Sequence, residues 1–372
     1  MKTAKRFIIR ILSMLLVTAV IMTVIVYTGK HGVRKDGLCY AASGIHPDCQ
    51  IVTINGTPVS AEEYLYLVSY DCQYLSQYVS NIDWNAEVSD GMTYGSYVKT
   101  DALETAKLYT ILRQWASKNG ITLTDADKAA MAAERAQYVT YYGSEEAYAN
   151  MIKLVGISEA TYKDTSSVYY LYSHIYEQFC DPGSKLYPGA DVLSSYGADG
   201  SYATIKEIFL STTGLTDEEK AAKQAQAQAI AEELKAASDI SAAFDTLSSV
   251  SEDSVAQKNP NGVTFAAGSL GNQVLEDAVA SLGEKQVSVV ESSGGYYVVV
   301  RLPLDASGLL ESYFSKELAD ARSSAAVTYS KEYNNLDVGS FYTALTQKRT
   351  DLSSQLSSAA SSSGGSSSNA AG

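Results

Sequence analysis

The stretch "KQVSVVESSGGYYVVVRL", Lys285 to Leu302, decides the fold of the middle of this 372-residue chain. Valine and tyrosine dominate two runs that lie on either side of Ser292–Gly294, which is the pattern of two antiparallel strands joined by a short turn. The second run, "GGYYVVVRL", is therefore expected to be the last strand of a small sheet.

The residues before this hairpin predict the rest of a compact domain. Thr216-x-x-Glu219 is a capping box that starts a long Ala/Gln/Lys/Glu-rich helix ending near Ala237. Strand and helix patterns surround it in the order β-α-α-β-α-β-β, at 202–211, 216–237, 242–250, 262–268, 273–282, 285–292 and 295–302. This order predicts an α+β domain.

The first half of the chain reads as helical. A short strand at Ile51–Ile54 and an Asn55-Gly56 turn precede a helix that a Ser60-x-x-Glu63 capping box opens. Further helices are expected to end at Gly120, to start at Thr124, and to span 144–155 and 158–179. The Gly- and Pro-rich segment 180–200 predicts a domain boundary, and 309–348 returns to a helical pattern.

Tyrosine is unusually frequent, with 28 Tyr against 7 Phe, which indicates wide apolar surfaces that also contact water. Tyr66, Tyr70, Tyr74 and Tyr78 fall four residues apart and share one face of the predicted helix. This spacing fits a packing stripe, and it also fits an aromatic wall for an extended apolar client.

The N-terminus predicts export. Four basic residues precede an uncharged apolar run over 11–29, which is long enough to cross a bilayer as a helix. We expect a single-pass cell-membrane anchor with the following domains on the extracytoplasmic side. A signal peptide cleaved near "CYAA", Cys39 to Ala42, is the alternative.

Charge excludes one class of partner. Residues 1–45 hold seven of the 28 Lys and Arg and one of the 42 Asp and Glu, so the remainder has 21 basic and 41 acidic residues and a formal charge of −20. Such a surface repels nucleic acid and favours basic or neutral clients.

The cysteines and histidines do not indicate a catalytic or metal site. Cys72–Cys180 is the disulfide to test in an exported protein, and free buried thiols are an equal alternative. His174 is expected to lie at a helix interface. Neither residue type has metal-ligand spacing, so no metal site and no cofactor are predicted.

Several segments together resemble the exported parvulin-type peptidyl-prolyl isomerases and chaperones, the PrsA and SurA group. The resemblance lies in "TINGTPVSAEEY", "LVGISEATYKDTSSVYYLYSHI", "FDTLSSVSEDSVAQKNPNGVTFAAG" and "LEDAVASLGEKQVSVVESSGGYYVVV", which together cover about 50–304. It implies a helical chaperone domain with an inserted parvulin-like domain.

The implied organisation has five parts. They are an N-terminal anchor or signal segment and linker (1–45), a helical N-domain (46–195), the parvulin-like domain (196–304), a C-terminal helix completing the chaperone domain (305–350) and a disordered Ser/Gly tail (351–372).

The resemblance also assigns site residues. Asp253 matches a family Asp or Cys, whereas Glu207 and Tyr297 stand where the family has histidines. Leu270 and Leu275 lie near the positions of the proline-pocket Met and Phe. Phe209 completes the Glu207-Ile208-Phe209 triplet. Asp253, Tyr297 and Glu207 are thus the catalytic candidates, and Leu270, Leu275 and Phe209 the substrate-binding candidates.

Two functions follow from this resemblance. One is a membrane-anchored foldase that isomerises prolyl bonds in secreted proteins. The other is a weak or inactive isomerase that works as a holdase, because both histidines are replaced and Glu207 brings a second carboxylate near Asp253. Both imply unfolded or proline-containing secreted polypeptides as partners, and a homodimer is left open.

Overall fold

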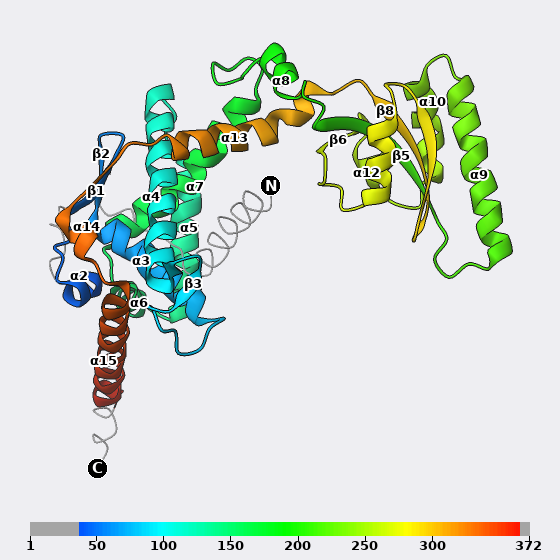
Figure 1. Ribbon diagram of the computed structural model, residues 1–372. Coiled ribbons are helices and arrows are strands. Elements are labelled where there is room, and N and C mark those ends of the chain that lie inside the picture. The colour runs from blue at the N-terminus through cyan, green and yellow to red at the C-terminus, as the bar shows by residue number, and fades with distance from the viewer. Residues whose placement is uncertain (1–36, 365–372) are drawn as a thin grey trace. The chain divides into compact units, whose positions relative to one another are not determined.

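The computed structural model describes residues 37–364, which form two compact units that are considered separately. The helical unit comprises 37–177 and 317–364, and the sheet unit comprises 178–316 (Figure 1). Among residues 37–364, no helix has the length and apolar character of a membrane span. The anchor predicted at 11–29 lies outside the described residues.

The helical unit is built mainly from long helices joined by short loops. Its helices are α2 (Leu38–Ser43), α3 (Ala61–Ser76), α4 (Tyr94–Asn119), α5 (Asp125–Tyr142), α6 (Glu145–Val155), α14 (Lys331–Asn335) and α15 (Val338–Gly364), with most of α7 (Glu159–Cys180) and the second half of α13 (Leu310–Ser323). Its strands are β1 (Gln50–Ile54), β2 (Thr57–Ser60), β3 (Glu87–Ser89), β4 (Met92–Thr93) and β9 (Val327–Tyr329).

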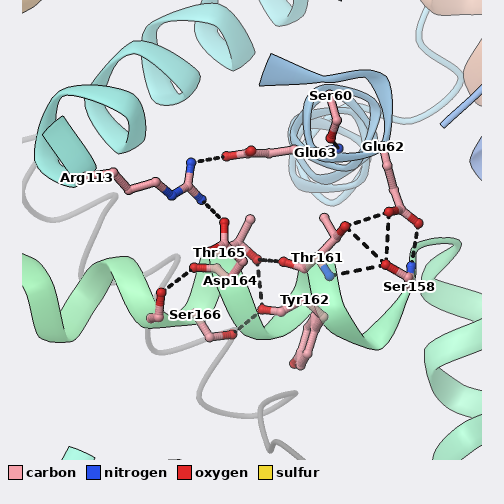
Figure 2. A network of polar contacts seen from close by, with 11 residues as sticks. Ser60, Glu62, Glu63, Arg113, Ser158, Thr161, Tyr162, Asp164, Thr165 and Ser166 are labelled. Carbon is pink, nitrogen blue, oxygen red and sulfur yellow. Dashed lines mark hydrogen bonds and ion pairs between the residues drawn. The ribbon is translucent and has the colours of Figure 1, made fainter. Parts of the chain in front are cut away.

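Local sequence signals explain most helix ends in this unit. Thr124 and Asp127 form the reciprocal capping box at the start of α5, and Gly120 ends α4 in the left-handed conformation. The Ser60 hydroxyl caps α3 by accepting from Glu63 N at 3.2 Å. The predicted box is only half formed, because the Glu63 carboxylate binds Arg113 instead (Figure 2).

Helix α2 lies within 1–45, the segment predicted as an anchor or signal segment and linker. Cys39 is only 1% exposed within the core of the helical unit, and its backbone N–H donates to Gly156 O at 3.3 Å. Six residues are too few to show a helical period, so the sequence did not reveal this element. Cleavage within Cys39–Ala42 would cut α2.

The helical unit is closed by both ends of the described chain. β1 pairs with β2 and also with β9, where Val52 lies opposite Tyr329. From α15, Phe341 and Leu345 enter the same core as α3 and α4. The Arg349 guanidinium then donates to the carbonyls of Leu154 and Val155 at 2.8 and 2.9 Å.

The tail predicted as disordered from 351 is helical as far as Gly364. Serine hydroxyls donate to carbonyls four residues earlier, as Ser354 does to Thr350 O and Ser358 to Ser354 O, both at 2.9 Å. The helix therefore continues although serine is a weaker helix former than alanine, and the composition alone predicted no fold.

The sheet unit follows the predicted order β-α-α-β-α-β-β, with one extra short helix. Its main elements are β5 (Tyr202–Ser211), α9 (Asp217–Ala236), α10 (Ile240–Leu247), α11 (Val255–Lys258), β6 (Val263–Ala266), α12 (Gln273–Ser281), β7 (Val287–Ser292) and β8 (Gly295–Leu302). The sheet order is β6-β5-β8-β7, and every pair is antiparallel.

Helices cover both faces of this sheet (Figure 1). Ile208, Val298 and Val300 pack with α9 and α10 on one face, whereas Val299 and Val290 pack with α12 on the other. The alternation of the strand side chains therefore assigns each residue to one of two cores.

The sheet unit is longer than the predicted 196–304. It also contains α8 (Ala190–Tyr196) and a 3₁₀ turn at Ala306–Leu309. Aromatic contacts hold these flanking segments together, with ring centroids 4.9 Å apart for Phe179–Phe314 and 5.1 Å for Tyr196–Tyr313. Contacts between residues so distant in sequence cannot be read from local patterns.

Candidate functional site

The strand register brings three of the predicted site residues to one face of the sheet. Phe209 on β5 lies opposite Tyr297 on β8, and their ring centroids are 4.7 Å apart. Glu207 lies two residues before Phe209, so it shares the face that α12 covers.

Gly295 fixes this register at the hairpin. A Cβ atom there would lie 2.1 Å from Leu210 O, and the residue has a φ of 153°. Glycine is therefore required where β8 begins in the register that places Tyr297 opposite Phe209.

The loop that follows α10 docks on the free edge of β5. β6 pairs only with Tyr202–Ile205, so the later part of β5 has no strand on this side. There Phe209 N donates to Ser251 Oγ at 2.9 Å, and Phe209 O accepts from Glu252 N at 2.8 Å. Ser211 N donates to the Glu252 carboxylate at 2.7 Å. These hydrogen bonds hold the loop along the part of β5 that β6 leaves unpaired.

This docking positions Asp253. One carboxylate oxygen accepts from Ser251 Oγ at 3.0 Å and from Val255 N at 3.1 Å. The negative charge of Asp253 acts on both Glu207 and Tyr297, so the three predicted catalytic residues influence one another electrostatically.

Burial dominates the electrostatics of this cluster. Glu207 is 9% exposed, and burial together with the negative charge of Asp253 raises its pKa from 4.5 to about 7. Burial and both carboxylates also raise the pKa of Tyr297, opposed by a hydrogen bond with the Asn272 side chain. Near neutral pH, therefore, the Glu207 carboxyl exists in both protonation states.

The predicted apolar residues divide into two kinds. Phe209 and Leu270 are half-buried, and Leu270 N donates to the Glu276 carboxylate at 2.8 Å. Leu275 is 3% exposed and packs in the core beneath α12 with Val290. The structure thus places Leu275 among supporting residues, while Phe209 and Leu270 offer surface.

Some contributors to this site were missed from the sequence. Glu276 is 8% exposed and accepts from the backbone N–H groups of Gly268 and Leu270, which fixes the loop before α12. Asn272 caps α12 and also reaches Tyr297. A cap signal followed by an acid, Asn272 to Glu276, was visible in the sequence, but its contact with the loop was not.

The family comparison agrees with this geometry. Residues 195–301 match the PPIC-type PPIase domain family. These residues of the sheet unit form a parvulin-type domain, called the parvulin domain below. No curated protein matches the chain.

Three solved structures show low similarity to the whole chain. PrsA of Bacillus subtilis is 14% identical with a TM-score of 0.26, covering 73% of this chain and 92% of that one. Foldase PrsA of Streptococcus pneumoniae is 18% identical with a TM-score of 0.23, covering 71% of this chain and 92% of that one. A SurA-like chaperone of Campylobacter jejuni is 15% identical with a TM-score of 0.22, covering 82% of this chain and 98% of that one. These values are too low to assign a function.

Outside the parvulin domain, the tyrosine stripe of α3 is graded in burial. Tyr66 is 8% exposed in the core, Tyr70 and Tyr74 are half-buried, and Tyr78 lies beyond the end of the helix with 72% exposed. The first tyrosine fits the packing interpretation, and only the far end presents an open aromatic surface.

The remaining candidates carry no catalytic grouping among the described residues. His174 lies on α7 with Nε2 2.8 Å from Asp127 Oδ2, which is the helix-interface role expected for it. Cys72 and Cys180 are free thiols in the structure. Within 37–364, no three His, Cys, Asp or Glu side chains are grouped as metal ligands.

Proposed function

We propose that the parvulin domain binds extended, proline-containing segments of unfolded polypeptides, and that the protein is an extracytoplasmic foldase held at the membrane by its N-terminal segment. One observation carries this proposal. Tyr297 and Glu207 share one sheet face with the half-buried Phe209 ring, and the charge of Asp253 acts on both, in a domain that matches the PPIase family.

Prolyl isomerisation suits such a site, because it breaks no covalent bond. The reaction rotates the bond over a barrier of roughly 18–20 kcal/mol, and an environment that favours the twisted imide lowers that barrier. Phe209 and Leu270 provide apolar surface for the proline ring. The Tyr297 hydroxyl can donate a hydrogen bond to the substrate from the strand position of a family histidine.

Glu207 can replace the other histidine only in part. When protonated, its carboxyl can donate to the Asp253 carboxylate, which would order the network beneath the proline. When ionised, two adjacent carboxylates repel each other, and the network is lost. We therefore expect weak isomerase activity that increases as the pH falls from 8 to 6.

A holdase is the second candidate, and the replacement of both histidines favours it. The helical unit also exposes aromatic side chains that could hold an unfolded client, with 79% of Tyr141 and 45% of Tyr169 accessible. In this case the parvulin domain would bind clients without accelerating their isomerisation.

A prolyl cis/trans assay on short Xaa-Pro peptides, with the full chain in mild detergent, separates the two functions. Acceleration that is lost in Asp253→Ala and Tyr297→Phe but kept in Glu284→Gln identifies an isomerase, because Glu284 is exposed in the same domain. No acceleration, with aggregation of an unfolded client still suppressed, identifies a holdase. Failure of both assays contradicts the proposal.

A further inference from the structure

Glu207 differs from the other buried acids of the described chain. Five acidic residues are less than 10% exposed, and four of them have partners. Those four are Glu62 (Ser158, Thr161), Glu63 (Arg113), Asp127 (Thr124, His174) and Glu276 (Gly268, Leu270). Figure 2 shows the partners of Glu62 and Glu63. The Glu207 side chain has no hydrogen bond or ion pair with any described residue.

A largely buried carboxylate without a partner is costly, because it loses much of its hydration and gains no hydrogen bond in return. A protein normally avoids this arrangement by providing a donor or an apolar residue. Here the unpartnered group lies on the face where the substrate is expected, beside Asp253 and between the side chains of Ile205 and Phe209 along β5. Its position therefore indicates that the ligand supplies the partner.

Three basic side chains on the elements around Glu207 are engaged elsewhere, whereas Lys258 on α11 is exposed to solvent. Lys206 points to the opposite face, where Nζ lies 2.5 Å from Asp245 and 3.0 Å from Ser241. Lys223 pairs with Glu252, and Arg301 donates to the carbonyls of Val279 and Leu282 at the end of α12. The only charge found to act on Glu207 is the negative charge of Asp253.

We propose that Glu207 and Asp253 select clients that have lysine or arginine next to the proline. An ammonium or guanidinium group would supply the donors that Glu207 lacks and would neutralise the carboxylate pair. The rings of Phe209 and Tyr297, which lie against each other on the same face, can pack on the methylene groups of such a side chain. The formal charge of −20 on residues 46–372 would also attract basic segments.

This inference rests on the proposed function, because it assumes that the parvulin domain binds prolyl peptides. It goes further by naming the residue type next to the proline and the two side chains that recognise it. A charged hydrogen bond contributes about 1.5–3 kcal/mol, so a lysyl peptide should bind roughly tenfold to a hundredfold more tightly than a neutral isostere.

The test uses the full chain in mild detergent and peptides that differ only beside the proline: lysine, norleucine, glutamine or glutamate, placed before or after it. NMR exchange spectroscopy measures both binding and cis/trans exchange of each peptide. We expect tighter binding of the lysyl peptide, weakened by salt. In Glu207→Gln the preference for lysine over norleucine should fall to about twofold, while Glu284→Gln should retain it.

Each other result has a distinct meaning. Equal binding of all peptides overturns the basic preference and leaves the proposed function intact. A lysine preference that survives in Glu207→Gln refutes the role of this side chain and assigns selectivity to the general negative charge. If no peptide binds or is isomerised faster, the proposed function fails at this site. Circular dichroism of Glu207→Gln confirms that the variant folds.

Discussion

Buried acids in the two units of this protein are treated in opposite ways. In the helical unit, Glu62 accepts from Ser158 N at 2.6 Å, and Glu63 binds Arg113, whose other nitrogen lies 2.8 Å from Asp164 (Figure 2). In the parvulin domain, Glu207 is as deeply buried and has no such partner. The first arrangement joins α3, α4 and α7, while the second leaves a buried group available to a ligand.

The difference separates structural from functional burial. A satisfied acid fixes the position of several elements, and removing its partner leaves a charge stranded in the core. An unsatisfied acid lowers the stability of the free protein, and that loss is recovered only when something binds. The three predictions below test this contrast, from the largest expected effect to the smallest.

Replacing Arg113 with methionine should have the largest effect. The change leaves Glu63, whose side chain is 10% exposed, without its cation, so the helical unit should lose about 3–5 kcal/mol of unfolding free energy. Both tryptophans, Trp84 and Trp115, lie in this unit, so urea unfolding followed by tryptophan fluorescence reports on it selectively.

The matched control for this substitution is Arg322→Met. Arg322 pairs with Glu104, whose side chain is 31% exposed, so its loss should cost less than about 1 kcal/mol. If Arg113→Met costs no more than Arg322→Met, the Glu63 pair does not hold α3 and α4 together. Adding Glu63→Gln to Arg113→Met should restore part of the loss.

Glu207 should make the parvulin domain less stable as pH rises. Its pKa is raised from 4.5 to about 7 in the folded state, so the folded protein binds a proton more tightly than the unfolded chain. The contribution of Glu207 to the unfolding free energy is therefore largest below pH 4.5. It falls as the pH rises to 7, by at most about 3 kcal/mol. Hydrogen exchange mass spectrometry of peptides from 202–302 measures the unfolding free energy of the parvulin domain separately from that of the helical unit.

Glu207→Gln provides the comparison for this pH series. The variant cannot ionise at this position, so the fall between pH 4.5 and 7 should be reduced and the variant should exceed the parent protein at pH 8. Equal slopes for parent and variant would show that a partner stabilises the Glu207 carboxylate in the free protein.

The smallest effect is expected at His174. Its hydrogen bond with Asp127 is the main cause that raises the pKa of His174 above 6.5, so this contact stabilises the fold below pH 6.5 and is lost as pH rises through the folded-state pKa. His174→Gln should cost roughly 1 kcal/mol or less at pH 5.5 and almost nothing at pH 9. Urea unfolding followed by tryptophan fluorescence measures this cost at both pH values. Equal losses of unfolding free energy at pH 5.5 and pH 9 would contradict a contact that depends on the charge of His174.

Local patterns predicted much of the fold. The turn at Ser292–Gly294, the helix start at Thr124, the capping box at Thr216 and the end of α4 at Gly120 each depend on a few neighbouring residues. Each of these features was visible in the sequence. Asp253, Tyr297 and Glu207 were named together only through resemblance to a family, and their catalytic role stays a prediction.

Distant contacts account for what the sequence could not show. Glu63 reads as a capping residue, and its actual partner, Arg113, is 50 positions away. Leu275 reads as a pocket residue, because the pattern of α12 does not say which side faces the sheet. The isolation of Glu207 is harder still to predict, since it requires knowing where every nearby basic side chain points.

The closure of the helical unit by α15 has a consequence for biosynthesis. Arg349 contacts Val155, which is 194 residues earlier, and β9 must reach β1 before the small sheet is complete. At about 5–20 residues per second, synthesis of that interval takes roughly 10–40 s. The parvulin domain is continuous in sequence, so it can finish folding first. Helices α3–α6 must wait, with their apolar faces uncovered, until almost the whole chain has been made.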